Sequence, residues 1–266
     1  MQNFNLHTHT YRCGHAQGTE EELVLAAIQA GFKTLGFSEH LPFADWEPMN
    51  SRILMEEVED YLSTVEALKI KYQDQIQILT GFESEYFEDQ QEWLKTIRKK
   101  VDYLILGQHI YFRNPELKEC CDEPYCQPQE FKKNAQCMID GIKSGLFSYV
   151  AHPDYVLLNG IELSEEHLAC FKEIAKTASE YHVPIEVNLK GTTRGTKEYK
   201  GVSMWKYPNA RVMEIFKEAG CQFVCGYDVH SCSMLFNREV EKEVRDAFEP
   251  LNLNWIYEID EIVKSQ

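Results

Sequence analysis

Short apolar runs recur along this chain, and each later run follows a stretch in which apolar residues recur at helical spacing. The runs predict strands and the stretches between them predict helices. Because strands and helices alternate throughout, we expect a parallel sheet with its helices outside. The expected strands lie at residues 4–10, 34–38, 76–82, 103–107, 147–151, 183–188 and 222–226.

The helix between the first two strands has recognisable ends. Thr19 and Glu22 have the spacing of a capping box, and Gly31 follows the last turn. Apolar residues at 23, 26, 27 and 30 lie at helical spacing between these ends. Further helices are expected at 54–74, 88–100, 129–145, 164–182, 208–220 and 236–248.

The lengths of the connections favour a barrel. Turns from helix to strand are short, whereas the connections after strands are long at 41–53, 110–128 and 189–207. Barrel enzymes keep their sites in the loops that follow the strands. We therefore expect an α/β fold, a distorted (β/α)7 TIM-like barrel, with residues 1–266 forming a single domain. An open doubly wound sheet is the second architecture, but no Gly-rich phosphate loop follows the first strand.

Composition excludes several classes of protein. The net charge of −16, from 27 basic and 43 acidic residues, disfavours tight nucleic-acid binding. No apolar run approaches the roughly 20 residues that span a membrane, and the N-terminus lacks the layout of a signal peptide. Nine cysteines, an odd number without an export signal, fit reduced thiols. We expect a cytoplasmic protein that binds neither membranes nor nucleic acid.

Polar side chains follow every expected strand, and in a closed parallel barrel these strand ends converge at one mouth. Seven of the nine histidines lie at or just beyond a strand end, counting His15 in the first loop. We expect the other two, His167 and His182, to be ordinary solvated residues. The strand-end candidates are His7, His9, Glu39, His40, Glu83, His109, His152, Glu186, Asn188, Asp228 and His230.

Imidazole and carboxylate together suit zinc, iron or manganese better than calcium or magnesium. His7 and His9, two residues apart in a strand, face the same way. The candidates outnumber the ligands of one ion, which implies a cluster of two or three ions. Glu83 is the natural bridging carboxylate.

Two weaker signals leave alternatives open. The loop after the fourth strand contains three cysteines, Cys120, Cys121 and Cys126. They could form a zinc knuckle, but no paired C-x-x-C set supports one, so free structural thiols are favoured. Glu85, two residues beyond Glu83, either faces the site or is solvated.

The residues that follow the strands resemble the motif series of the PHP (polymerase and histidinol phosphatase) superfamily, in the expected order over nearly the whole chain. The chain length and the segment 36–42, GFSEHLP, resemble the histidinol-phosphate phosphatase branch. Glu186-Val187-Asn188 followed by Arg194 is similar to that branch's E-x-N…R segment. The motifs that carry the resemblance are His7-Thr8-His9, His15, Ser38-Glu39-His40, Glu83, His109, Ala151-His152-Pro153 and Asp228-Val229-His230.

The resemblance implies a PHP-type barrel with three divalent metal ions, usually zinc, iron or manganese. The family's ligand pattern assigns His7, His9, Glu83 and Asp228 to one ion, Glu83, His109 and His152 to a second, and His15, His40 and His230 to a third. Two segments depart from the family pattern. The usual G-S-D-A-H is Gly226-Tyr227-Asp228-Val229-His230 here, and the usual Ser-x-His is Gly107-Gln108-His109.

The expected function is a phosphomonoesterase that hydrolyses L-histidinol phosphate in histidine biosynthesis. A metal-bridging hydroxide would attack phosphorus in line, with Glu83, Asp228 and His230 in the catalytic centre and Arg194 clamping the phosphate or solvated. One alternative is a PHP phosphoesterase acting on nucleotides or oligonucleotide ends. The other is a metal-binding or interaction protein on a decayed barrel, which would predict missing ligands.

Overall fold

The computed structural model describes residues 1–44, 46, 50–110, 118–199 and 201–263. Parts of the connections expected at 41–53, 110–128 and 189–207 therefore lie outside the described residues. No helix among the described residues is long and apolar enough to cross a membrane.

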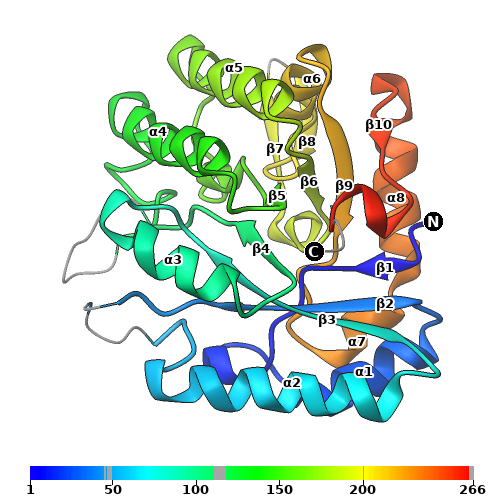
Figure 1. Cartoon of the computed structure of the whole chain (residues 1–266). Helices are drawn as coiled ribbons and strands as arrows, with labels where there is room; N and C mark the ends of the chain where they lie inside the picture. The colour runs from blue at the N-terminus through cyan, green and yellow to red at the C-terminus, as the bar shows by residue number, and fades with distance from the viewer. Residues whose placement is uncertain (45, 47–49, 111–117, 200, 264–266) are drawn as a thin grey trace.

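One eight-stranded sheet forms the centre of the molecule, and each pair of neighbouring strands in it is parallel (Figure 1). The seven expected strands are confirmed, and an eighth, β10, joins the edge at β9. In spatial order the strands are β1 (Phe4–Asn5), β2 (Thr34–His40), β3 (Gln77–Ser84), β4 (Tyr103–Leu106), β5 (Tyr149–Val150), β6 (Ile185–Asn188), β9 (Gln222–Gly226) and β10 (Asn254–Trp255).

The sheet curls until the segment beyond its first strand meets the segment beyond its seventh. Thr8 and Val229 form a parallel bridge. The N–H of His9 donates to the carbonyl of Val229 at 2.8 Å, and the N–H of Val229 donates to the carbonyl of His7 at 2.9 Å. The barrel-like α/β fold is thus confirmed, and the open doubly wound sheet is excluded.

The expected helices are confirmed outside this sheet, with ends shifted by a few residues (Figure 1). The capping box of Thr19 and Glu22 is present at the start of α1. Besides β10, the sequence did not predict the short helix α7 or the antiparallel hairpin of β7 (Thr196–Tyr199) and β8 (Val202–Trp205). The α-helices are α1 (Glu20–Gln29), α2 (Val58–Tyr72), α3 (Gln91–Arg98), α4 (Pro128–Ser144), α5 (Glu165–Glu180), α6 (Ala210–Glu218), α7 (Cys232–Phe236) and α8 (Arg238–Phe248). The 3-10 helices are η1 (Tyr11–Cys13), η2 (Met55–Glu57), η3 (Glu88–Gln90), η4 (Tyr155–Leu157), η5 (Lys190–Arg194), η6 (Glu249–Leu251) and η7 (Ile259–Glu261).

Side chains alternate between the two faces of the sheet, as a strand requires. In β4, Leu104 belongs to the large core shared with the helices, whereas Tyr103 belongs to a second core in which side chains of several strands meet. The Tyr103 hydroxyl lies 2.7 Å from the carbonyl oxygen of Leu6. A Cβ at Gly81 would meet the Tyr103 ring at 2.6 Å, so the ring needs a glycine there. Glu83, two residues beyond Gly81, lies on this same inner face.

The expectation that His167 is solvated is wrong, because its side chain is buried. His167 completes the capping box of α5, where the N–H of Ser164 donates to its Nδ1. Its Nε2 lies 2.8 Å from the carbonyl oxygen of Cys126. His182 is exposed, as expected.

A candidate metal centre at the strand ends

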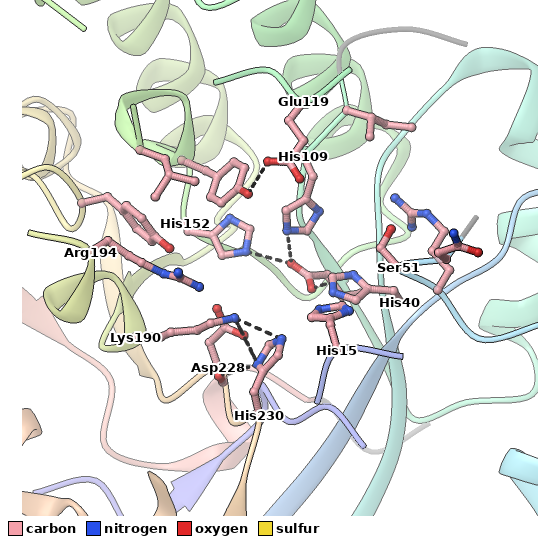
Figure 2. A pocket seen from close by; sticks show the side chains of 17 residues that line it. His15, His40, Ser51, His109, Glu119, His152, Lys190, Arg194, Asp228 and His230 are labelled. Carbon is pink, nitrogen blue, oxygen red and sulfur yellow. Dashed lines mark hydrogen bonds and ion pairs between the residues drawn. The ribbon is translucent and has the colours of Figure 1, made fainter. Parts of the chain in front are cut away.

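A cavity of about 660 Å³ opens where the strands end (Figure 2). Two of the expected ligands, His7 and His9, are fully buried and do not line it. The expected site residues on its wall are His15, His40, Glu83, His109, His152, Arg194, Asp228 and His230.

A first set of donor atoms comes from His7, His9, Glu83 and Asp228. The Oε2 atom of Glu83 lies 3.2 Å from Nε2 of His7 and 3.3 Å from Nε2 of His9. The Oδ1 atom of Asp228 lies 3.6 Å and 3.5 Å from the same two nitrogens. Ligands placed tetrahedrally at about 2.1 Å from an ion are about 3.4 Å apart. The spacing of these four donors therefore fits one cation.

The hydrogen bonding of these atoms points to the same conclusion. His7 Nε2, His9 Nε2 and Glu83 Oε2 are buried and make no hydrogen bond with the described residues. An unsatisfied buried polar atom costs about 1–3 kcal/mol, so several in contact need an explanation. A bound cation satisfies all of them at once.

The other carboxylate oxygen of Glu83 belongs to a second set. Its Oε1 lies 2.9 Å from Nε2 of His152 and 3.3 Å from Nε2 of His109. Each oxygen of Glu83 thus faces a different pair of histidines, which is the arrangement that a bridging carboxylate requires. His40 also lies close, with Nδ1 at 3.2 Å from Oε2.

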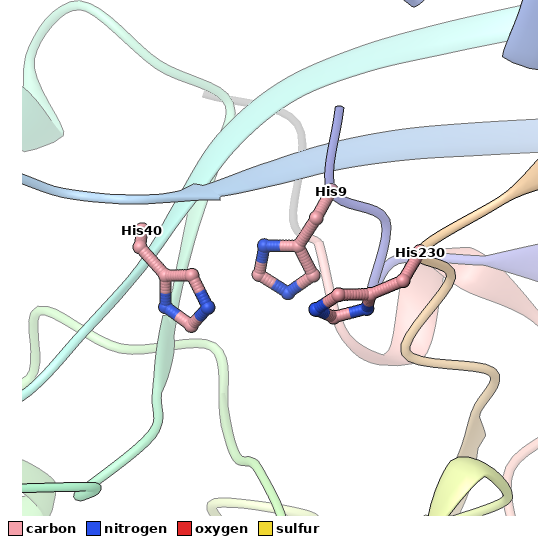
Figure 3. A group of neighbouring side chains, drawn as sticks. All are labelled: His9, His40 and His230. Atoms are coloured by element: carbon pink, nitrogen blue, oxygen red, sulfur yellow. The ribbon is translucent and has the colours of Figure 1, made fainter. Parts of the chain in front are cut away.

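The third expected set, His15, His40 and His230, is more spread out. The ring centre of His15 lies 4.9 Å from that of His230 and 5.3 Å from that of His40. Instead, donor atoms of His9, His40 and His230 lie within 4.8 Å of one another. Figure 3 shows these three rings around a common space. The structure therefore brings His15 to the cluster and also places His9 beside the third set.

Carboxylates behind the histidines orient two of the rings. Glu186 Oε1 lies 2.7 Å from His7 Nδ1, and Glu85 Oε1 lies 3.2 Å from His109 Nδ1. Such outer partners fix the tautomer of a metal-binding histidine and increase its basicity. Glu85 is fully buried and also pairs with Arg52 at 2.6 Å, so the solvated alternative for Glu85 is wrong.

Two glycines make room for the inner carboxylates. A Cβ at Gly107 would lie 2.0 Å from Glu83 Oε1, and one at Gly226 would lie 1.7 Å from Glu186 Oε1. Gly107 stands in one of the two segments that depart from the family pattern, and in this chain it leaves the space that the Glu83 carboxylate fills.

The charges in the cluster favour the ligand-competent forms of Glu83, Asp228 and His9, whereas nearby carboxylates, Glu186 at His7 and Glu83 at His109, raise the pKa of those two histidines against their burial. Burial alone would raise the pKa of Glu83, but the surrounding histidines, His109 first, hold it well below its usual range. The pKa of Asp228 is likewise lowered against its burial, by Lys190, His7 and His230. Burial lowers the pKa of His9 well below its ordinary value. Ionised carboxylates and a neutral imidazole are the forms that bind a metal.

Several side chains of the cavity wall were not anticipated from the sequence, among them Lys190, Glu119 and Tyr155. Lys190 lies two residues beyond the strand-end residue Asn188, and its Nζ is 3.0 Å from His230 Nε2 and 3.5 Å from Asp228 Oδ1. Glu119 and Tyr155 line the same cavity. The position of Lys190, just beyond a strand end, was the one available signal for these residues.

The three cysteines of the fourth loop are free and buried. The Cys120 thiol donates to the carbonyl of Gln108, and the Cys121 thiol donates to Glu119 Oε2, each at 3.4 Å. Among the described residues, no group of three potential metal ligands includes Cys120, Cys121 or Cys126. Their contacts are those of structural thiols.

The sequence from residue 5 to residue 190 matches the model of the PHP domain family. A Deinococcus radiodurans protein named "Probable histidinol-phosphatase" is 24% identical over 250 residues, covering 91% of this chain and 92% of that protein. A Schizosaccharomyces pombe protein of the same name is 27% identical over 254 residues, covering 84% and 79%. The fold resembles that of the Lactococcus lactis histidinol phosphate phosphatase, which was solved with zinc, L-histidinol and phosphate. The TM-score is 0.70 at 14% sequence identity, and the match covers 96% of this chain and 95% of that one.

Proposed function

This chain belongs to the PHP domain family, and from that premise we propose that it is a metal-dependent phosphomonoesterase that hydrolyses L-histidinol phosphate to L-histidinol and phosphate. The observation that carries the proposal is the pair of donor sets that share the carboxylate of Glu83. The choice of substrate is supported by the names of the relatives and by the ligands of the related structure.

The donor atoms fit divalent cations, and we propose three, drawn from zinc, iron and manganese. His7, His9, Glu83 and Asp228 would hold one ion, and Glu83, His109 and His152 a second. His15, His40 and His230, with His9 close by, would hold the third. When bound, such ions stabilise negative charge on the phosphoryl oxygens and supply a nucleophile at neutral pH.

Residues of the chain position the two donor sets and the phosphate group of the substrate. Glu83 sets the spacing of the first two donor sets, because each of its oxygens faces a separate pair of histidines. Arg194 and Lys190, both from η5, place two cationic groups on the cavity wall, with Lys190 beside His230 (Figure 2). Cationic side chains bind phosphate through charge-assisted hydrogen bonds, and the guanidinium can bind two oxygens at once. We propose that Arg194 clamps the phosphate group and that Lys190 assists it.

Further features agree with a biosynthetic enzyme of the cytoplasm. All nine cysteines are free, which suits a reducing compartment. One sheet runs from β1 to β10, and we propose that residues 1–266 form a single domain. The product L-histidinol leads us to propose a role in histidine biosynthesis.

A substrate panel tests the function. The ratio of kcat/KM for L-histidinol phosphate to that for nucleoside monophosphates and for oligonucleotides with phosphorylated ends should exceed about 100. A preference for nucleotides or oligonucleotide ends would establish the alternative PHP phosphoesterase. Bound metal without hydrolysis of any phosphate ester would favour a non-enzymatic protein.

A further inference from the structure

The charged side chains on the cavity wall are unevenly placed. Glu83 and Asp228 belong to the histidine cluster, and the cations Lys190 and Arg194 lie to one side of it. The third cation of the wall, Arg52, is paired with Glu85. Among the described residues of the wall, Glu119 is the one remaining carboxylate, and Figure 2 shows it next to His109. A negative group beside an anion-binding site disfavours phosphate, so Glu119 needs another explanation.

Glu119 is held in place from two sides. The Tyr155 hydroxyl donates to its Oε2 at 2.7 Å, and the Cys121 thiol donates to the same atom. The Tyr155 ring packs edge-on against His109, with ring centres 5.2 Å apart, and lies 5.4 Å from His152. The position of the carboxylate is thereby fixed relative to the second donor set.

The backbone gives a second link between Glu119 and the cluster. Ile110 and Glu119 form an antiparallel bridge, and the N–H of Cys120 donates to the carbonyl of His109 at 2.7 Å. Among the described residues, the hydrogen-bond donors to the Glu119 carboxylate are Tyr155 and Cys121, and neither is a cation. Glu119 is therefore a fixed, half-buried carboxylate that faces the cavity and has no positive partner within the described chain.

A cationic substrate supplies such a partner. The leaving group of L-histidinol phosphate carries a primary ammonium on the carbon next to the ester CH₂. In this substrate the ammonium is a few bonds from the phosphate, so a phosphate bound at the histidine cluster would bring it within reach of the cavity wall. We propose that Glu119 binds the ammonium of the leaving group and so makes the site selective for phosphate monoesters of amino alcohols. This inference rests on the proposed phosphatase function and names the residue that selects its substrate.

The test compares two esters that differ only in the amine. These are L-histidinol phosphate and its deamino analogue, 3-(imidazol-4-yl)propyl phosphate, assayed with the metal-loaded protein. Glu119→Gln should lower kcat/KM for L-histidinol phosphate by about 10- to 100-fold, because a charge-assisted hydrogen bond to the ammonium is weakened. The same variant should hydrolyse the deamino ester within about twofold of the wild-type rate.

Two further variants make the test specific. Glu123→Gln removes the same charge from an exposed position in the same segment and should change neither ester. Tyr155→Phe removes the hydroxyl that holds Glu119. It should lower the preference for the aminated ester by a smaller factor than Glu119→Gln does. This variant also provides a test if Glu119→Gln does not fold.

The outcomes separate the inference from the function. Equal losses on both esters, or no loss on either, in Glu119→Gln would overturn the role of Glu119 while leaving the phosphatase intact. Failure of the wild-type protein to hydrolyse both esters would overturn the proposed function and this inference with it.

Discussion

The carboxylate of Glu186 lies 2.7 Å from Nδ1 of His7, and both side chains are fully buried. Its other oxygen accepts hydrogen bonds from the backbone N–H of His152 and from Nδ2 of Asn188, each at 3.0 Å. One carboxylate thus links a histidine of the first donor set to a histidine of the second. Glu186 therefore controls the relative position of the two sets.

Substitution of Glu186 by glutamine tests this link. Glu186→Gln keeps the size of the side chain and removes the charge that orients His7, so metal affinity should fall by about 10- to 100-fold. Metal titration of the stripped protein measures this, and excess metal should restore activity. Glu173→Gln, an exposed change on α5, serves as the control. Unchanged affinity in Glu186→Gln would show that His7 needs no carboxylate partner.

Glu83 should be needed for both of the first two donor sets. Glu83→Gln removes the negative charge shared by these sets, and kcat should fall by at least about 1,000-fold, equivalent to several kcal/mol of lost stabilisation. His109→Ala alters the second set alone and should retain metal at the first. Metal content per chain, measured together with activity, distinguishes the two variants. Full activity in either variant would contradict the assignment of these residues as ligands.

The position of the Glu83 carboxylate should require a glycine at residue 107. A Cβ in Gly107→Ala would lie 2.0 Å from Glu83 Oε1, so the carboxylate must move and metal content should fall. The matched control is Gly145→Ala at the end of α4, where the glycine has φ of 69° and no atom within 4 Å of an added Cβ. That change should lower the free energy of unfolding by about 1–2 kcal/mol through backbone strain and leave metal content intact. Equal metal content in the two variants would contradict the steric argument.

Arg194 should act in phosphate binding. Arg194→Ala should lower kcat/KM for L-histidinol phosphate by about 10- to 100-fold and weaken inhibition by inorganic phosphate to a similar extent, because a charge-assisted hydrogen bond is lost. Lys217→Ala, an exposed change on α6, removes the same charge away from the cavity and should have no effect. A wild-type phosphate inhibition constant in Arg194→Ala would show that Arg194 is a solvated loop residue.

The buried thiols should react slowly in the folded protein. Burial raises the pKa of Cys120 and Cys121 well above the ordinary value and that of Cys126 to about 11, so little reactive thiolate forms at pH 8. Mass spectrometry after iodoacetamide treatment should find Cys120, Cys121 and Cys126 unlabelled until the protein is unfolded. Faster labelling of these three after chelation alone would instead indicate a zinc knuckle.

The sheet could be predicted from the sequence because its strands are apolar runs bounded by turn signals. β10 was not predicted because it consists of only two residues, Asn254 and Trp255, and Asn254 is polar. The hairpin of β7 and β8 was not predicted because β7 is mostly polar and because seven of the eight hairpin residues are exposed or half-buried, unlike those of the central strands.

The site could be predicted in part because parallel strands bring their ends together. The strand-end position placed Glu83 and His152 at one mouth of the barrel, and the family resemblance assigned them to one ion. The strand-end position could not tell which oxygen of Glu83 faces which histidine, or that Glu186 lies behind His7, since these depend on how far side chains reach across strands. Glu119 could not be predicted, because it lies in a long connection whose path is set by tertiary contacts.

One measurement tests the central claim most directly. The purified protein is analysed for bound metal and, on the same sample, for phosphate release from L-histidinol phosphate before chelation, after chelation and after metal is restored. We predict three divalent ions per chain, turnover that disappears on chelation, and its recovery when metal is added back. Turnover that persists in the metal-free protein, or its absence from a fully loaded sample, would contradict a metal-dependent histidinol phosphatase.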